Sequence, residues 1–179
     1  PYKREWADGN SRWDILDLAR AARDLRPEGI HWPVTEDGKP TVKLELLTQA
    51  KHLSHEHAHD ALSDVYATIA VAKLIHEKQP KLFEWAFRHR TKDRARTMID
   101  LADRTPVVHT SSIHYSAQGN TTLVCPLVTD PERRNVVHAF DLRWDPEPLF
   151  SLPEDEIRRR LFTPAAELAA EGVERIPLK

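Results

Sequence analysis

Apolar residues in the first half of the chain recur every three to four positions, the period of an amphipathic helix. This period predicts a first helix between Ser11, which we expect to be the N-cap, and Pro27, which cannot continue a helix. A shorter helix is predicted over residues 43–52. The buried stripe of the first helix is expected to consist of Ile15, Leu18, Ala19, Ala22 and Leu25.

A longer helix is predicted to begin at Asp60 and to run to about residue 75. A carboxylate at its N-cap can accept the unpaired N–H groups of the first turn. Pro80 then predicts the first turn of another helix, because proline is tolerated at that position. The buried face of the longer helix is predicted to carry Leu62, Val65, Ile69, Ala72 and Ile75.

The pattern changes near residue 106, where β-branched and apolar residues begin to dominate. Pro126 predicts that the second of the resulting strands lies at a sheet edge or contains a bulge. The expected class is therefore α+β, with a boundary that divides residues 1–104 from residues 105–179. Strands are predicted over residues 107–115, 121–129 and 135–142, and short helices over residues 151–162 and 164–172.

Net charge limits the kinds of partner that the chain can bind, and cysteine content limits the cellular compartment in which it works. The formal net charge of −2 over 179 residues means that any nucleic-acid binding must come from a local basic track. Residues 88–96 are the most basic run, and the alternative is that they form a solvated helix face. A single cysteine, Cys125, excludes an internal disulfide and favours a cytoplasmic location. No apolar run reaches membrane-spanning length, so we expect no membrane partner.

His59 and Asp64 are the residues with the clearest catalytic potential. On one continuous helix they would diverge by about 140°. With His59 on the preceding loop, both can face a cleft at the helix N-terminus, where the dipole favours a phosphate. An imidazole beside a metal-binding carboxylate suits metal-assisted phosphodiester hydrolysis. The alternative is a capping aspartate among solvated polar neighbours.

Residues 59–75, HDALSDVYATIAVAKLI, resemble the third active-site motif of the DnaQ-like (DEDDh) 3′–5′ exonucleases, and in particular the bacterial exodeoxyribonuclease I family. Further segments resemble the same family in the same order along nearly the whole chain. They are Tyr2 with Trp6, NSRWD at residues 10–14, LRPEGI at 25–30, QPKLF at 79–83, GNT at 119–121 and PERRN at 131–135.

The resemblance implies a fold and a chemistry. Residues 1–104 would be the helical C-terminal part of a ribonuclease H-like exonuclease domain with its connecting helix, and residues 105–179 an incomplete SH3-like domain. Family members hold two Mg²⁺ ions with four acidic residues. Asp64 matches the last of these acids, and His59 matches the histidine proposed as general base.

The family's first motif, Asp-x-Glu on a central strand, is absent here, as is the segment that carries the third acid. Glu45, Asp141 and Asp155 with Glu156 lack the apolar strand context of a substitute. We therefore expect the chain to be a piece of a longer protein, to bind Mg²⁺ weakly through Asp64, and to be inactive by itself.

The resemblance also implies single-stranded DNA as substrate and a role in DNA repair. Tyr2 and Trp6 match aromatic positions that could stack on bases, although a core role is the alternative. The partner expected besides DNA is the C-terminal tail of single-stranded-DNA-binding protein, and we expect a monomer. Arg26 could contact either DNA or this acidic tail. Basic and polar positions of the DNA path match Arg20, Lys43 (usually arginine in the family), Lys92 and Asn135.

Two other functions compete with this assignment. An HD-type metal phosphohydrolase is suggested by His59-Asp60, but it needs further ligands, for which His31 and Asp100 are poor candidates. A non-catalytic single-stranded-DNA-binding module is the other. A zinc site would need three or four convergent ligands, which a polar histidine-rich loop rarely provides; the histidines concerned are His52, His55, His57 and His59.

Overall fold

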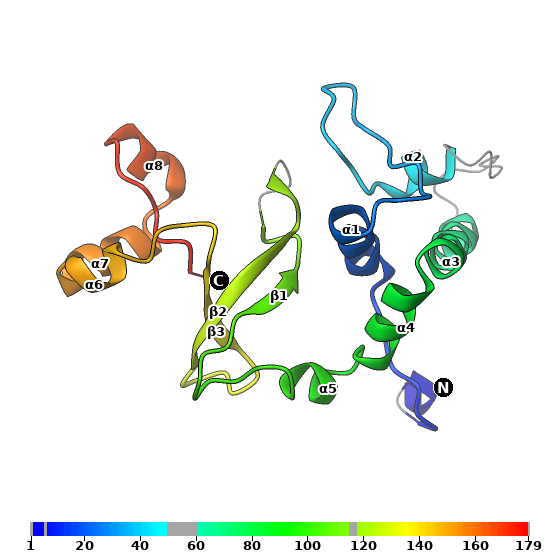
Figure 1. Ribbon diagram of the computed structural model, residues 1–179, viewed down its shortest axis with the longest axis horizontal. Coiled ribbons are helices and arrows are strands. Elements are labelled where there is room, and N and C mark those ends of the chain that lie inside the picture. The colour runs from blue at the N-terminus through cyan, green and yellow to red at the C-terminus, as the bar shows by residue number, and fades with distance from the viewer. Residues whose placement is uncertain (1, 6, 50–60, 115–117, 179) are drawn as a thin grey trace. The chain divides into compact units, whose positions relative to one another are not determined.

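The computed structural model describes residues 2–5, 7–49, 61–114 and 118–178. The chain divides into two compact units, which we treat separately. A helical unit comprises Pro1–Met98 with Thr110–Thr121, and a second unit comprises Ile99–His109 with Thr122–Lys179. Figure 1 labels the elements of both units.

The helical unit confirms the predicted helices and moves one of their boundaries. The N-cap of α1 is Asp14, whose Oδ1 accepts the Leu16 N–H at 2.8 Å, so the prediction of Ser11 is wrong. The Ser11 hydroxyl instead accepts a hydrogen bond from Arg90 Nε at 2.8 Å. Pro80 occupies the first turn of its helix, as predicted. The elements are η1 (Tyr2–Glu5), α1 (Ile15–Leu25), α2 (Leu44–Gln49), α3 (Ala61–Lys78), α4 (Pro80–Arg88) and α5 (Lys92–Arg96).

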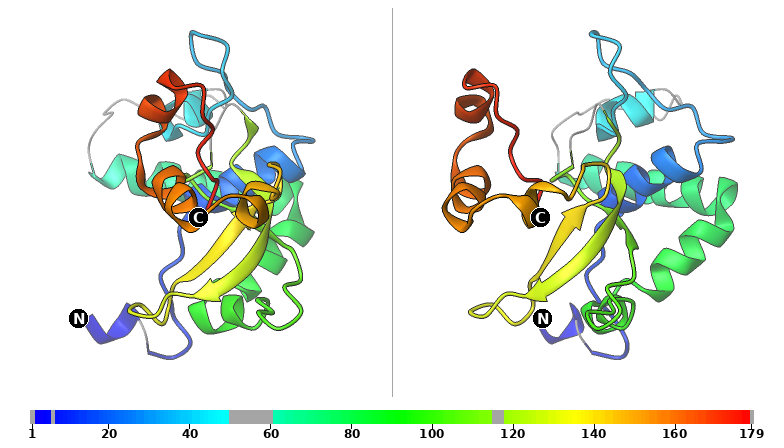
Figure 2. Two further views of the ribbon diagram at one scale, coloured as in Figure 1. Left: turned by 90° about the vertical axis from the view of Figure 1, so that its left-hand side faces the viewer. Right: turned by 60° about the vertical axis from the view of Figure 1, so that its left-hand side comes forward.

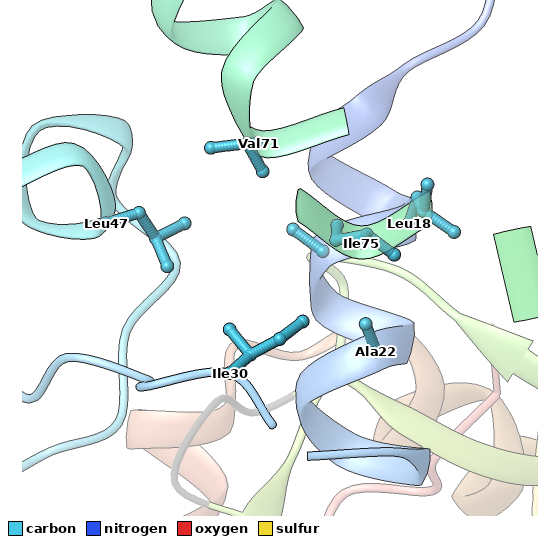
Figure 3. Close-up of a cluster of buried hydrophobic side chains, with 7 residues drawn as sticks. Leu18, Ala22, Ile30, Leu47, Val71 and Ile75 are labelled. Carbon is cyan, nitrogen blue, oxygen red and sulfur yellow. The ribbon is translucent and has the colours of Figure 1, made fainter. Parts of the chain in front are cut away.

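The core of the helical unit lies where α1, α2 and α4 pack against α3. Figure 3 shows the buried side chains that α1, α2 and α3 contribute to it. Ile75 of α3 and Ala22 of α1 are fully buried at its centre. Trp13 packs edge-on against Phe83 of α4, with ring centroids 5.3 Å apart. The buried residues of this core are Leu18, Ala19, Ala22, Ile30, Leu47, Val71 and Ile75.

The predicted buried face of α3 is partly wrong. Leu62, Val65 and Ile69 are exposed, at 57%, 52% and 44%. The buried positions instead follow the spacing of four residues through Ala67, Val71 and Ile75. The helix carries apolar residues on two faces, and α1, α2 and α4 cover only one of them.

The strands form a three-stranded sheet in the order β1-β2-β3, with β1 (Val107–Thr110), β2 (Thr121–Thr129) and β3 (Val137–Asp141). The antiparallel β2–β3 pair aligns Val124 with Asp141 and Thr129 with Val137. Pro126 therefore lies in the central strand, so the edge alternative is wrong. The bulge alternative is confirmed, because the register shifts between Pro126 and Val128.

Three short helices follow the sheet, α6 (Pro148–Ser151), α7 (Glu154–Phe162) and α8 (Ala165–Ala170). After them the chain returns to β3, where Leu178 forms an antiparallel bridge with Phe140. The mixed α and β class is thus confirmed, and the predicted boundary at residues 104 and 105 stays a prediction. Within the described part of the chain, no helix combines the length and apolar character needed to cross a membrane.

Asp141 corrects another expectation. It is the last residue of β3 and is fully buried, so it does have a strand context. Its carboxylate accepts hydrogen bonds from Thr122 Oγ1 at 3.0 Å and from Arg143 Nη2 at 2.6 Å. The side chain is therefore engaged in an internal ion pair and cannot serve as a metal ligand without breaking it.

Candidate functional site

Asp64 lies in the first turn of α3 and is exposed to solvent. Its carboxylate forms no hydrogen bond or ion pair with any residue that the structure describes, while its backbone carbonyl accepts the Thr68 hydroxyl at 2.8 Å. An exposed carboxylate there is accessible to a cation, while the helix N-terminus itself favours a phosphate bound nearby. His59 and Asp60 lie outside the described residues.

The carboxylates and histidines of the described residues do not converge on a complete metal site. Across residues 2–5, 7–49, 61–114 and 118–178, no group of three or more His, Cys, Asp or Glu side chains is arranged to hold a metal ion. Mg²⁺ is held by one or two carboxylates together with water and substrate phosphate. Asp64 fits one position in such a coordination shell, and further ligands must come from other residues. The histidines at 52, 55, 57 and 59 lie outside the described part.

His31 and Asp100 do not supply the ligands of an HD-type site. His31 is an exposed residue of the helical unit, whereas Asp100 belongs to the second unit. The Asp100 carboxylate accepts the backbone N–H groups of Ala102 and Asp103 at 2.9 and 3.0 Å. Asp100 therefore stabilises a turn, and the structure gives this alternative no support.

The predicted DNA-contact residues of the helical unit differ in availability. Arg20 on α1 is largely buried, with 15% of its side chain exposed, and its Nη1 donates to Asp17 Oδ1 at 2.6 Å. Lys43, directly before α2, is exposed. Because α1 and α2 both pack against α3, Arg20, Lys43 and Asp64 lie on elements that share one core. Tyr2 is in η1, and Trp6 lies outside the described residues.

Lys92 is the first residue of α5 and is exposed. Thr91 caps this helix by accepting the Arg94 N–H at 3.4 Å. The basic run at residues 88–96 therefore covers the end of α4, a three-residue connection and all of α5. Most of its basic side chains are solvent-exposed, as a phosphate-binding track requires.

Asn135 is exposed and belongs to the turn between β2 and β3. Figure 2 shows this turn as the yellow loop that joins the two strands. Asp130 organises this turn by accepting the N–H groups of Glu132 and Arg133 at 3.0 and 2.8 Å. It also accepts Arg133 Nη2 at 2.8 Å and contacts His138 Nε2 at 3.1 Å. Hydrogen bonds hold the pKa of the Asp130 carboxyl well below its usual range; the largest contribution comes from the Arg133 side chain and the next from the Arg133 backbone N–H.

Sequence reasoning did not assign Asp130 a role in this site. The signal that could have found it is Asp-Pro-Glu-Arg at residues 130–133, since an aspartate that starts a turn accepts backbone N–H groups two and three residues later. The carboxylate fixes the backbone ahead of Asn135 and contacts the His138 side chain after it, so the turn presents its exposed residues from a fixed base.

Comparison with known proteins gives the family. The family model described as "Exonuclease I SH3-like domain" matches residues 90–179. Exodeoxyribonuclease I of Haemophilus influenzae is 48% identical to the chain over all 179 residues. A crystal structure of Escherichia coli Exonuclease I in complex with a dA16 oligonucleotide superposes on the whole chain with a TM-score of 0.91 at 46% identity. An ExoI/SSB-Ct complex does so with a TM-score of 0.88 at 45% identity.

The chain covers 38% of the length of each of these three relatives. The likeness nevertheless extends over every residue of the chain, and the matched SH3-like region contains the sheet and the three helices that follow it. The chain therefore belongs to the exonuclease I family, with its SH3-like domain at residues 90–179.

Proposed function

We propose that the chain is part of a 3′–5′ exonuclease that degrades single-stranded DNA to nucleotides by metal-assisted phosphodiester hydrolysis. The single observation that carries the proposal is the exposed carboxylate of Asp64 in the first turn of α3, which has no partner among the described residues and lies within a segment that resembles an exonuclease motif. The substrate follows from the E. coli relative that was solved with an oligonucleotide.

Asp64 and His59 have different roles in the proposed reaction. The Asp64 carboxylate provides one ligand to a divalent cation, for which we propose Mg²⁺, and the His59 imidazole orients the attacking water and accepts its proton. Two such cations, when bound, supply Lewis acids that activate the water and stabilise the leaving 3′ oxygen. A relative from E. coli has been solved in a zinc-bound form with single-stranded DNA, which supports metal dependence.

Single-stranded DNA is held, in this proposal, by basic and polar side chains together with aromatic stacking platforms. The side chains are Arg20, Lys43, Lys92 and Asn135, and the platforms are Tyr2 and Trp6. The second partner is the C-terminal tail of single-stranded-DNA-binding protein, by analogy with the ExoI/SSB-Ct complex.

We assign the helical unit to the C-terminal helical part of a ribonuclease H-like domain. Support comes from α3, whose exposed stripe of Leu62, Val65 and Ile69 is unusual for a helix that already packs against three others. A helix that covers a sheet on one side and other helices on the opposite side has apolar residues on both faces.

The test uses the chain with a 5′-labelled oligo-dT and Mg²⁺. We expect binding, detected as increased fluorescence anisotropy, without shortening of the oligonucleotide on a denaturing gel, because the described residues provide only a partial metal site. In a protein of the relatives' full length, Asp64→Asn should abolish nucleotide release and leave oligonucleotide binding intact.

Asp64→Asn is a matched control, because the amide has the size of the carboxylate but lacks its charge. If the chain by itself shortened the oligonucleotide, and Asp64→Asn removed this activity, the expected inactivity of the chain would be contradicted and the enzyme assignment supported. No binding of oligo-dT by the wild-type chain would argue against the nucleic-acid role.

Asp130→Ala should weaken oligo-dT binding about as much as Asn135→Ala does, although Asp130 is mostly buried beneath the turn. The substitution removes four hydrogen-bonding contacts from the turn and leaves the Asn135 side chain in place. Anisotropy titrations of both variants measure the effect. Asp145→Ala, which removes a single backbone contact from another exposed turn, is the control. Wild-type affinity for Asp130→Ala combined with a loss for Asn135→Ala would refute the positioning role.

A further inference from the structure

A pocket of about 460 Å³ lies where α4 ends and α5 begins. Its walls contain three arginines and one carboxylate, so its charge is positive. Apart from Lys92, which lies within this stretch of chain, none of the residues assigned to DNA binding or catalysis above is near it in sequence. The pocket is lined by Glu84, Phe87, Arg88, Arg90, Thr91 and Arg94.

Arg90 is held rigidly at the edge of this pocket. Its guanidinium carbon lies 4.0 Å from the centroid of the Phe87 ring, in a cation–π contact. Its nitrogens donate to Ser11 Oγ at 2.8 Å, to the Phe87 carbonyl at 2.8 Å and to the Gly9 carbonyl at 2.9 Å. The planar group is therefore fixed before any ligand arrives, and little side-chain entropy remains to be lost on binding.

Arg88 and Arg94 have the opposite character. Both are exposed, and neither side chain forms a hydrogen bond or ion pair within the part of the chain that the structure describes. They flank Arg90 in sequence and line the same pocket. Two free guanidinium groups can each bind phosphate oxygens in a bidentate manner.

We infer that this pocket binds one nucleotide of single-stranded DNA, with a base against the planar Arg90–Phe87 pair and the adjacent phosphates on Arg88 and Arg94. The inference rests on the proposed function, which supplies the substrate, and adds a site to it. A stacked arginine–aromatic pair suits a base, because every base has a π-face that can lie on a planar cation. An acidic peptide would use the arginines but not this flat surface.

The test compares oligo-dT binding by the whole chain and by the double variant Arg88→Ala/Arg94→Ala, using anisotropy over a range of salt concentrations. We expect affinity at low salt to fall at least tenfold. The slope of log K against log salt should become less steep by about 1.4, because each lost phosphate contact on single strands contributes about 0.7. Lys39→Ala/Lys73→Ala removes the same charge from exposed positions outside the pocket and should change affinity less than about twofold.

Other results of this experiment would distinguish a failure of the proposed pocket from a failure of the proposed DNA binding. Equal losses in the two double variants would overturn the site but leave DNA binding by the chain in place. A wild-type chain that fails to bind oligo-dT would overturn both. Binding of a labelled oligoglutamate that competes with oligo-dT and depends on Arg88 and Arg94 would reassign the pocket to an acidic peptide. Circular dichroism melts of both variants establish that they are folded.

Discussion

Ile75→Ala is expected to destabilise the helical unit by about 2–5 kcal/mol, the usual cost of truncating an isoleucine in a packed core. Ile75 is fully buried where α1 and α3 meet, and its neighbours Leu18, Ala22 and Val71 cannot all move to fill the cavity. Urea unfolding followed by circular dichroism at 222 nm measures the loss.

Ile69→Ala is the matched control. It makes the same chemical change on the same helix, but Ile69 is 44% exposed. We expect less than about 0.5 kcal/mol, as for other surface substitutions. If the two variants lost equal stability, the buried face of α3 would be assigned wrongly.

Arg143→Ala is expected to cost the second unit about 3 kcal/mol, the lower end of the range for breaking a buried ion pair. The Asp141 side chain is 1% exposed and would keep its charge without its main partner, whereas Arg143 is 25% exposed. Amide hydrogen exchange in β2 and β3 should become about 100-fold faster, since each tenfold change corresponds to about 1.4 kcal/mol.

Two variants separate charge burial from lost packing. Asp141→Asn combined with Arg143→Ala should recover part of the stability, because the unpaired charge is gone. Arg133→Ala, which breaks a pair whose arginine is 65% exposed, should cost less than about 1 kcal/mol. A double variant less stable than Arg143→Ala would show that an uncompensated charge is not the cause.

The same pair makes stability depend on pH. Burial raises the pKa of the Asp141 carboxyl, but hydrogen bonds from the Arg143 side chain, the Arg143 backbone and Thr122 outweigh burial and lower it from 3.8 to about 2. A lowered pKa stabilises the folded state above pH 3.8, and this stabilisation is lost as the pH falls towards 2. The urea midpoint should therefore drop more steeply over this range in the wild-type chain than in Arg143→Ala.

The sequence predicted the kinds of element correctly because periodicity and turn residues are local properties. Which face of α3 is buried is not local. Both Leu62–Val65–Ile69 and Ala67–Val71–Ile75 have helical spacing, and the choice depends on where α1, α2 and α4 pack. The N-cap of α1 was misplaced for a related reason, since Ser11 is engaged by Arg90, which is 79 residues away.

Only the part of the candidate site that lies within a sequence motif could be predicted. The segment containing Asp64 identified a carboxylate that the structure places in solvent at the start of α3. The basic run at residues 88–96 was visible as composition, but the sequence could not distinguish the fixed Arg90 from Arg88 and Arg94, which have no partner among the described residues. Two of the hydrogen bonds that fix Arg90 go to Gly9 and Ser11, which lie far away in the chain.

The bulge in β2 has a consequence for changes in chain length. The register passes from Pro126 to Val128, so Leu127 is a surplus residue in the central strand. Thr122, Val124 and Pro126 are buried on alternate positions before it. Deleting Leu127 would remove the bulge but leave Val128 opposite His138 and Thr129 opposite Val137, so the later side chains would keep their faces of the sheet. A deletion should therefore be tolerated better at position 127 than at a paired position of β2, where losing one residue would transfer side chains to the opposite face.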